Sequence, residues 1–339
     1  MFRIKNLALS WQAMVMHAVA ANALETYDSI TIREDLSDAE NMISPVETPF
    51  MSRIAGRTTA SNKYHEWPIV ELGSVDSSNR VPEGEDAPSI DAPVLALRRG
   101  NYTQISDKVV KVTDTSQRVD GAAKVEKLSK QIAYKLKELK RDKETMLLAN
   151  VAADPGAATG ATTRKAAGLS AFSLTNDQLG TSGTSPTLSG TTTGYPNAAA
   201  VNGTLRNFDE TMLGNAIQAV WTEGGDPKYV MCSPTNKKTI SDFTGNATKY
   251  KDANDKKITR SIDVYESDFG QVQVIPNRFN PARDVFILDP EFIKIAELQP
   301  TRQLELARTG HTENRLIQSE YTLEVGNEKA MAVVRDTNG

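Results

Sequence analysis

GAAKVEKLSKQIAYKLKELKRDKETMLLANV, residues Gly121 to Val151, decides the fold because its apolar residues predict one long helix. Successive apolar residues step by three, four, four and three positions, which places them on a single helical face. This stripe consists of Val125, Leu128, Ile132, Leu136 and Leu139, and Met146 resumes it two turns later. Asp120 can cap the start, and Asp154-Pro155-Gly156 ends the pattern. At ~1.5 Å per residue, ~30 residues form a rod on the order of 45 Å long.

The opposite face of this predicted helix is basic. Between Lys124 and Glu144 the chain carries seven lysines and one arginine against four acids. The whole chain has a formal net charge of −4, whereas a dedicated nucleic-acid binder usually shows a basic domain or stripe. An ordinary solvated helix face is therefore the better interpretation, with at most a weak contact to polyanion.

Two segments that precede the helix predict a long β-ribbon. KYHEWPIVEL (Lys63–Leu72) and VLALRRGNYTQISDKVVKVT (Val94–Thr113) are rich in β-branched and aromatic residues with partial two-residue alternation. Residues 73–93 between them contain three prolines and are far more than a tight hairpin turn requires. An isolated two-stranded ribbon is marginally stable and has open edges, so we expect another chain to support it.

The tip of this ribbon, VPEGEDAP (Val81–Pro88), is dense in carboxylates, and three interpretations are open. The acids could bind calcium through their oxygens, form a solvated tip, or make a charged contact with a neighbouring subunit. The third fits the open edges best, because basic residues lie on the returning strand and would suit head-to-tail pairing between copies. The candidate residues for contacts between copies are Trp67, Glu83, Glu85, Asp86, Arg98 and Arg99.

The remaining segments differ in composition. Residues 1–25 predict an amphipathic arm, because polar residues interrupt the apolar run that a signal peptide would need, and no stretch is long and apolar enough for a membrane span. Ala152–Gly203 is dominated by Gly, Ala, Ser and Thr and predicts an exposed insertion or flexible loop. From Thr204 helices and strands alternate, as in an α/β unit, and the last segment predicts a half-buried antiparallel sheet.

We find no pattern that predicts catalysis. The sequence lacks a nucleophile elbow, a phosphate-binding loop, a dinucleotide-binding glycine motif and a zinc-protease motif. His17, His65 and His311 are scattered, and no two residues among the histidines and the cysteine fall within one helical turn or one loop, as a metal site would need. The single cysteine, Cys232, is expected to be a small buried residue. We therefore expect no enzyme activity, no cofactor and no metal.

The order of these parts, a strap, a long ribbon, a long helix, an α/β unit and a return to antiparallel strands, resembles the major capsid proteins of tailed bacteriophages with the Hong Kong 97 (HK97) fold. Four stretches carry the resemblance over roughly residues 26–335: TYDSITIREDLSDAENMISPVETPFMSRI, YHEW, WTEGGDPKYVMCSP and SEYTLEVGNEKAMAVV. The resemblance implies an α+β chain that self-assembles into an icosahedral shell around double-stranded DNA.

The resemblance also implies an order of domains. These are an N-terminal arm (1–55), an extended E-loop β-hairpin (56–113), the P-domain spine helix with its Gly/Thr-rich insertion (114–203), an α/β A-domain (204–300) and the P-domain return strands (301–339). The spine helix would pack on the terminal sheet through Tyr321, Leu323 and Val325.

The implied partners are copies of the chain itself in hexamers and pentamers. Portal, scaffolding and cement proteins are further expected partners, and packaged DNA would be contacted non-specifically. The protein would be located in the virion after assembly in the host cytoplasm, without a membrane.

Two alternatives remain. An encapsulin-type nanocompartment subunit has the same fold but encloses protein cargo, and the N-terminal strap favours a phage protein over it. A soluble α/β enzyme with a flexible lid at Ala152–Gly203 is the alternative from a different class, and the absence of catalytic motifs counts against it.

Overall fold

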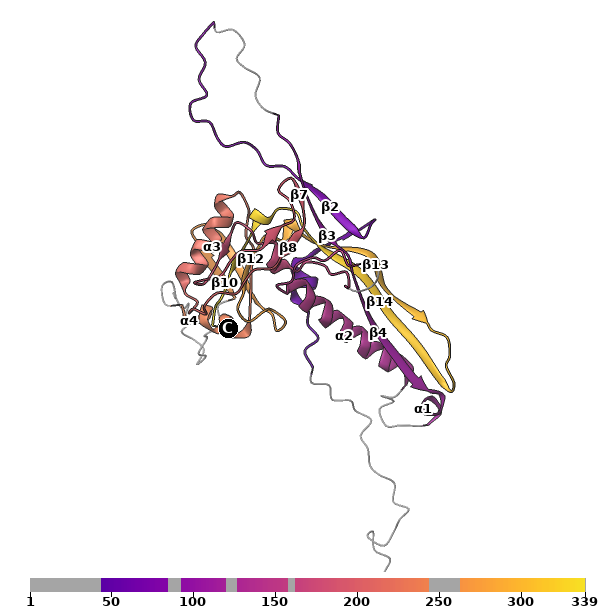
Figure 1. Ribbon diagram of the computed structural model, residues 1–339. Coiled ribbons are helices and arrows are strands. Elements are labelled where there is room, and N and C mark those ends of the chain that lie inside the picture. Colours follow the sequence, from indigo (N-terminus) through magenta and orange to yellow (C-terminus); the bar gives the residue numbers. More distant parts are fainter. Residues whose placement is uncertain (1–43, 85–92, 120–126, 158–161, 244–262, 339) are drawn as a thin grey trace, which may run out of the picture.

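The computed structural model describes residues 44–84, 93–119, 127–157, 162–243 and 263–338. The chain has an elongated part, made by a long sheet and helix α2 (Leu128–Leu148), and a rounded α/β unit at one end of it (Figure 1). A hairpin loop projects from the junction of the two parts, away from α2 (Figure 1). The predicted ribbon, helix and α/β unit are thus all present.

The long sheet has four strands in the order β1-β13-β14-β4. The strands are β1 (Gly56–Thr59), β4 (Gln104–Thr113), β13 (Ile293–Glu305) and β14 (Thr312–Val325). Strand β14 lies in the middle and pairs antiparallel with both β13 and β4. The short helix α1 (Asp114–Arg118) follows β4 directly. The predicted antiparallel sheet near the C-terminus is confirmed for β14, which carries the alternating Tyr321, Leu323 and Val325.

Helix α2 is shorter than predicted. It begins at Leu128 after Lys127, whose backbone is extended, so its 21 residues span roughly 31 Å at ~1.5 Å per residue. Asp120 and Val125 lie outside the described residues. The helix ends at Leu148 instead of near Asp154, because the side-chain amide of Asn150 exchanges two hydrogen bonds with the backbone of Ala200.

The apolar face of α2 packs on β4 and β14, partly as predicted. Leu139 is 2% exposed and contacts Val110, Val112 and Ile317, and Leu128 and Ile132 pack against the same cluster. Leu136 is 42% exposed, so its prediction as a core residue is wrong for the single chain. The buried residues of α2 are instead gathered in its C-terminal half, at Leu139, Lys143, Glu144, Leu147 and Leu148.

The hairpin consists of β2 (Tyr64–Ile69) and β3 (Leu97–Tyr102), which pair antiparallel as predicted. The segment Val94–Thr113 is not one strand, however. It divides at Thr103, whose N–H donates to the carbonyl of Lys63, and its second half is β4 of the long sheet. A third strand, β7 (Thr193–Gly194), joins β3 in parallel.

The α/β unit contains a six-stranded sheet in the order β10-β11-β9-β12-β15-β5. Its strands are β5 (Asp177–Gln178), β9 (Tyr229–Cys232), β10 (Val264–Ser267), β11 (Gly270–Pro276), β12 (Val285–Leu288) and β15 (Met331–Val334). Helices α3 (Glu210–Thr222) and α4 (Pro234–Asp242) accompany it, and the side chains of Asp209 and Ser233 cap their first turns. The alternating α/β unit is therefore confirmed, although β15, from the last segment, belongs to it and not to the long sheet.

The Gly/Thr-rich insertion is not an exposed flexible loop in its described residues. The short 3₁₀-helix η3 (Leu169–Phe172) is fully buried, and Ala167, Leu169 and Phe172 are part of the largest core cluster. The strands β6 (Thr187–Leu188) and β8 (Pro196–Ala198) pair further along. The prediction from composition is wrong here, because three apolar side chains are enough to pack this segment into the core cluster.

The N-terminal strap enters the same core through the π-helical turn η1 (Phe50–Ile54). Phe50 is fully buried, and Met51 and Ile54 are nearly so. Strand β1, which follows, adds to the long sheet parallel to β13. The strap thus contributes to a core that other segments build, in agreement with the prediction that it forms none by itself. No helix within the described ranges is both long and apolar enough to span a bilayer.

Candidate functional site

The loop between β2 and β3 exposes apolar side chains that no described residue of the chain covers. It extends far beyond both parts of the subunit (Figure 1). Its exposed apolar residues are Val70, Leu72, Val75, Val81, Val94 and Leu95, and Leu72 is 85% and Leu95 76% exposed. Apolar residues gathered on one projecting segment are typical of a surface that another protein covers. The described residues of this segment, 70–84 and 93–95, are called the hairpin loop.

The predicted contact residues lie at different places on this hairpin. Glu83 is exposed on the hairpin loop, whereas Glu85 and Asp86 lie outside the described residues. Arg98 is exposed at the base and pairs with Glu66 at 3.7 Å. Arg99 donates from Nη1 to the carbonyl of Thr191 at 2.9 Å. The two arginines therefore lie at the opposite end of the hairpin from Glu83.

Trp67 lies in the core of its own subunit. It is 6% exposed, and its ring packs against Phe172 at 6.1 Å and His65 at 5.8 Å between centroids. Its Nε1 has no hydrogen-bond partner among the described residues. In the single chain Trp67 thus supports the base of the hairpin and presents no exposed surface.

The base of the hairpin is fixed to the long sheet by side chains from both. Asn101 donates to the carbonyls of Ala167 and Leu323, and Thr103 donates to the Glu320 carboxylate at 2.6 Å. His65 Nε2 lies 3.0 Å from Glu324 Oε2. These further hydrogen bonds hold the hairpin base in a defined direction, so the loop is presented on a rigid support.

Two charged residues on the buried face of α2 were missed by the sequence reasoning. Lys143 is 4% exposed, donates to Ser319 Oγ at 2.6 Å and Thr301 Oγ1 at 3.0 Å, and lies 4.9 Å from the ring centroid of Tyr321. Burial lowers the pKa of Lys143 below its ordinary value. Continuing the spacing by four residues beyond Leu139 would have predicted Lys143 on the inner face.

Glu144, the next residue, is fully buried and faces the strap and the α/β unit. Its carboxylate accepts hydrogen bonds from Phe50 N at 2.7 Å, Met51 N at 3.0 Å and Asn277 Nδ2 at 2.8 Å. Burial raises the pKa of Glu144, and these three hydrogen bonds oppose that change. Helix α2 is therefore joined to its surroundings by a buried cation on one side and a buried carboxylate on the other.

A second polar cluster holds the insertion to the C-terminal segment. The guanidinium of Arg335 is buried, pairs with Asp177 and donates to both the side chain and the carbonyl of Ser170. The adjacent Asp336 accepts from the backbone N–H groups of Gly180 at 3.0 Å and Gly203 at 2.9 Å. Arg335 and Asp336 thus make structural hydrogen bonds, which is the usual arrangement for buried polar side chains, whereas Asp177 Oδ2 has no hydrogen-bond partner among the described residues.

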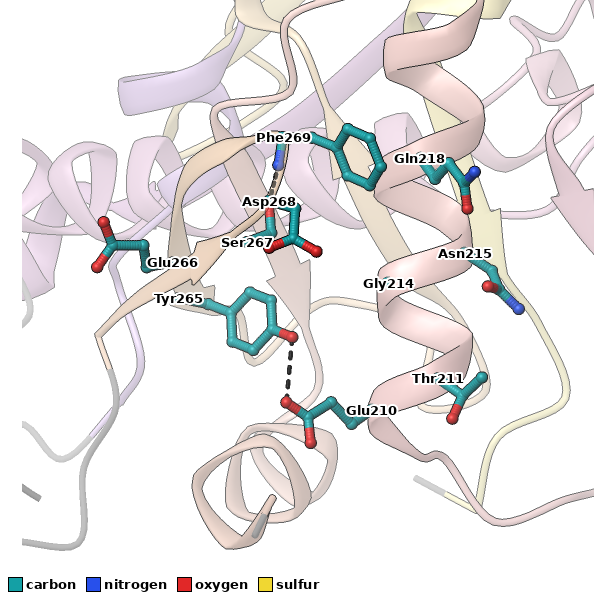
Figure 2. Close-up of a pocket in the computed structure, with 10 residues that line it drawn as sticks. All are labelled: Glu210, Thr211, Gly214, Asn215, Gln218, Tyr265, Glu266, Ser267, Asp268 and Phe269. Atoms are coloured by element: carbon teal, nitrogen blue, oxygen red, sulfur yellow. Dashed lines mark hydrogen bonds between the residues drawn. The ribbon is translucent and has the colours of Figure 1, made fainter. Parts of the chain in front are cut away.

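The α/β unit has a pocket of about 410 Å³ between α3 and the β10–β11 hairpin (Figure 2). Tyr265 Oη donates to Glu210 Oε1 across it at 3.2 Å, and Phe269 closes one end (Figure 2). Glu266 points away from α3, so the acids of the pocket do not converge (Figure 2). Its lining contains no cysteine, histidine or lysine, and the arrangement has no nucleophile with an adjacent base.

The remaining reactive side chains also lack a catalytic setting. Burial raises the pKa of the Cys232 thiol to about 12, so the thiolate nucleophile is disfavoured. His311 Nδ1 lies 3.3 Å from Asp114 on the surface, and His17 is outside the described residues. No group of three or more potential metal ligands occurs in the described parts of the chain.

A family model matches nearly the whole chain. The family model of the SU10 major capsid protein matches residues 18–338. The major capsid protein of Escherichia phage Phieco32 is 25% identical over 337 residues, covering 91% of this chain and 95% of that protein.

Solved structures show the fold. A chain from Gordonia phage Cozz superposes with a TM-score of 0.59 at 10% identity and covers 96% of this chain and 98% of its own. The holo-SrpI encapsulin of Synechococcus elongatus PCC 7942 gives 0.52 at 10% identity, with coverage of 90% and 92%. The predicted α+β HK97-like fold is thereby confirmed. Together with the match of the family model over nearly the whole length, this places the chain in the SU10 major capsid protein family.

Proposed function

We propose that this chain is the subunit of the icosahedral shell that encloses the double-stranded DNA genome of a tailed bacteriophage. The observation that carries the proposal is the hairpin loop, which exposes Leu72 and Leu95 on a segment that the described parts of its own chain do not cover. Membership of a major capsid protein family supports the same conclusion. The function is mechanical, and many identical copies supply the surfaces that one copy leaves open.

The hairpin loop of one copy lies over an adjacent copy and buries its apolar side chains there. Because the patch on the loop differs from the surface that receives it, the contact is head-to-tail and closes into rings. Glu83, Glu85 and Asp86 at the tip meet basic residues of the neighbour, with Arg98, Arg99 and the lysines of α2 as the candidates. The α/β unit points toward the centres of the hexamers and pentamers.

The domain boundaries of this proposal follow the resemblance: an arm (1–55), an E-loop (56–113), a spine helix with insertion (114–203), an A-domain (204–300) and return strands (301–339). The fold supports one refinement of these boundaries. Strands β4 and β13 are grouped with the return strands, because both belong to the long sheet.

Further partners follow from the role of a shell subunit. Portal, scaffolding and cement proteins contact the shell, and packaged DNA contacts it without sequence preference. The protein resides in the virion after assembly in the host cytoplasm, and it catalyses no reaction. The paired and buried state of its polar clusters supports a structural role.

Electron microscopy of the purified protein across a concentration series tests the proposal. We expect closed shells, tubes or capsomer rings that increase with concentration. A monodisperse monomer at the highest concentration would contradict self-assembly. Nucleic acid extracted from particles purified with their contents distinguishes the DNA-filled shell from the encapsulin alternative, for which protein cargo would be recovered instead.

A further inference from the structure

We propose that Glu144 is the residue that anchors the N-terminal strap to α2 and to the α/β unit. The strap is defined here as residues 44–55, which end in η1 and Ala55. Glu144 acts through its contacts with other segments, so it is a positioning residue.

The three hydrogen-bond donors to Glu144 come from two distant parts of the chain. Phe50 and Met51 belong to the strap and lie 94 and 93 residues away in sequence. Asn277 follows β11 of the six-stranded sheet and lies 133 residues away. One carboxylate on α2 therefore joins the strap, the helix and the α/β unit at a single point.

The strap cannot satisfy its first N–H groups by itself. Pro49, at the position before η1, provides no side-chain cap, and Thr48 Oγ1 has no hydrogen-bond partner among the described residues. The N–H groups of Phe50 and Met51 instead donate to the two oxygens of Glu144. A buried backbone N–H that loses its acceptor is unfavourable, so seating of the strap depends on this carboxylate.

Asn277 is oriented by other bonds and presents its amide N–H to Glu144. Its Oδ1 accepts from Phe279 N at 2.9 Å, and its backbone N–H donates to the carbonyl of Cys232 at 2.9 Å. With the oxygen already engaged, the Nδ2 group faces Glu144 Oε1. The described donors occupy both oxygens of Glu144, because Phe50 N and Asn277 Nδ2 donate to Oε1 and Met51 N donates to Oε2. The site therefore needs an acceptor with two oxygens and cannot use an amide equally well.

A buried carboxylate is an unfavourable choice for stability alone, because an apolar residue of similar size would avoid the loss of hydration. Burial raises the pKa of Glu144, which agrees with that loss. The surrounding core already packs Phe50 and Ile54 with Leu147 and Leu148. The carboxylate adds a directional link, which apolar contacts do not provide.

The substitution Glu144→Gln tests this role in the full-length protein. Gln keeps the volume but turns one acceptor oxygen into an NH₂ donor that faces other donors. Glu138→Gln on the same helix is the matched control, because Glu138 is partly exposed and pairs with Lys135. Trypsin cleavage after Arg53, whose side chain is exposed in η1, reports release of the strap.

We expect Glu144→Gln subunits to be cleaved after Arg53 at least about tenfold faster than the parent, since hydrogen bonds to charged groups are stronger than neutral ones. Hydrogen exchange of the Phe50 and Met51 amides should accelerate similarly, whereas amides of Leu213 and Ile217 in α3 should keep their protection. Glu138→Gln should leave both readouts within about twofold of the parent.

Two outcomes would overturn the proposal. In the first, cleavage after Arg53 and exchange at Phe50 and Met51 are unchanged in Glu144→Gln. In the second, the protection of α3 is lost to the same degree, which would make Glu144 a general core residue. Both readouts use the unassembled subunit, so the test is independent of shell formation.

Discussion

Replacing Leu72 and Leu95 of the hairpin loop with serine should weaken assembly without changing the stability of the subunit. The two side chains are 85% and 76% exposed, so they contribute almost nothing to the core of the single chain. In the assembled shell they would be covered by a neighbour, and burial of one leucine is worth about 1.5–3 kcal/mol.

The expected magnitude follows from these exposures. Two leucines that are mostly exposed in the subunit together lose about 2.5–5 kcal/mol of burial per hairpin contact. Since every 1.4 kcal/mol is about tenfold in an association constant, the contact should weaken by roughly 60- to 4,000-fold. The ordering of the loop on binding reduces this figure, so a 100-fold increase in the critical concentration for assembly is the appropriate expectation.

The critical concentration is measured by sedimentation velocity over a dilution series of the parent and the double variant. Circular dichroism and thermal unfolding check that the subunit remains folded, with unfolding temperatures within about one or two degrees of each other. Leu205→Ser provides the control, because Leu205 is 52% exposed outside the hairpin loop. An unchanged critical concentration for the double variant would refute the assignment of the hairpin loop as the covered surface.

Three further predictions concern the spine helix, the C-terminal segment and the tip. Leu139→Ala should lower the free energy of unfolding by about 2–5 kcal/mol, because Leu139 is 2% exposed, whereas Leu136→Ala, at 42% exposure, should cost less than about 1 kcal/mol in denaturant unfolding. For Asp336, burial favours a higher pKa, but hydrogen bonds from Gly180 N, Gly203 N and Arg283 outweigh it and lower the pKa below the ordinary 3.8. Its contribution is therefore present above about pH 4 and lost as the pH falls through the lowered pKa. Asp336→Asn should flatten the loss of stability below about pH 4, and an equally steep loss there would contradict this. Replacing Glu83, Glu85 and Asp86 together with lysine should reduce shell yield in electron micrographs while circular dichroism stays native; normal shells would exclude an electrostatic role for the tip.

The sequence predicted elements whose signals are local. Helix α4 has Pro234 in its first turn and Ser233 as its cap, both of which are sequence signals for a helix start. Strand β9 was predicted from the short apolar run in KYVMCS, and the hairpin from two β-rich segments. The resemblance to a capsid protein family rested on the order of these elements along the chain. Local sequence patterns are sufficient to predict that order.

The sequence could not predict features that depend on contacts between distant residues. Arg335 and Asp336 hold the insertion from more than 130 residues away, so its Gly- and Thr-rich composition alone suggested a flexible loop. The sequence predicted Lys143 and Glu144 as part of a solvated charged face. Their hydrogen-bond partners lie on β13, β14, the strap and the segment after β11, which are distant in sequence. The sheet to which β15 belongs was likewise determined by pairing with β12 and β5.

The most direct test of the account is an electron cryomicroscopy reconstruction of the particles that this protein forms. We predict a closed icosahedral shell in which the hairpin loop of each subunit lies on a neighbouring copy, with Leu72 and Leu95 buried at that contact. A shell in which the hairpin loop projects into solvent, or a protein that stays monomeric at every concentration, would contradict the account.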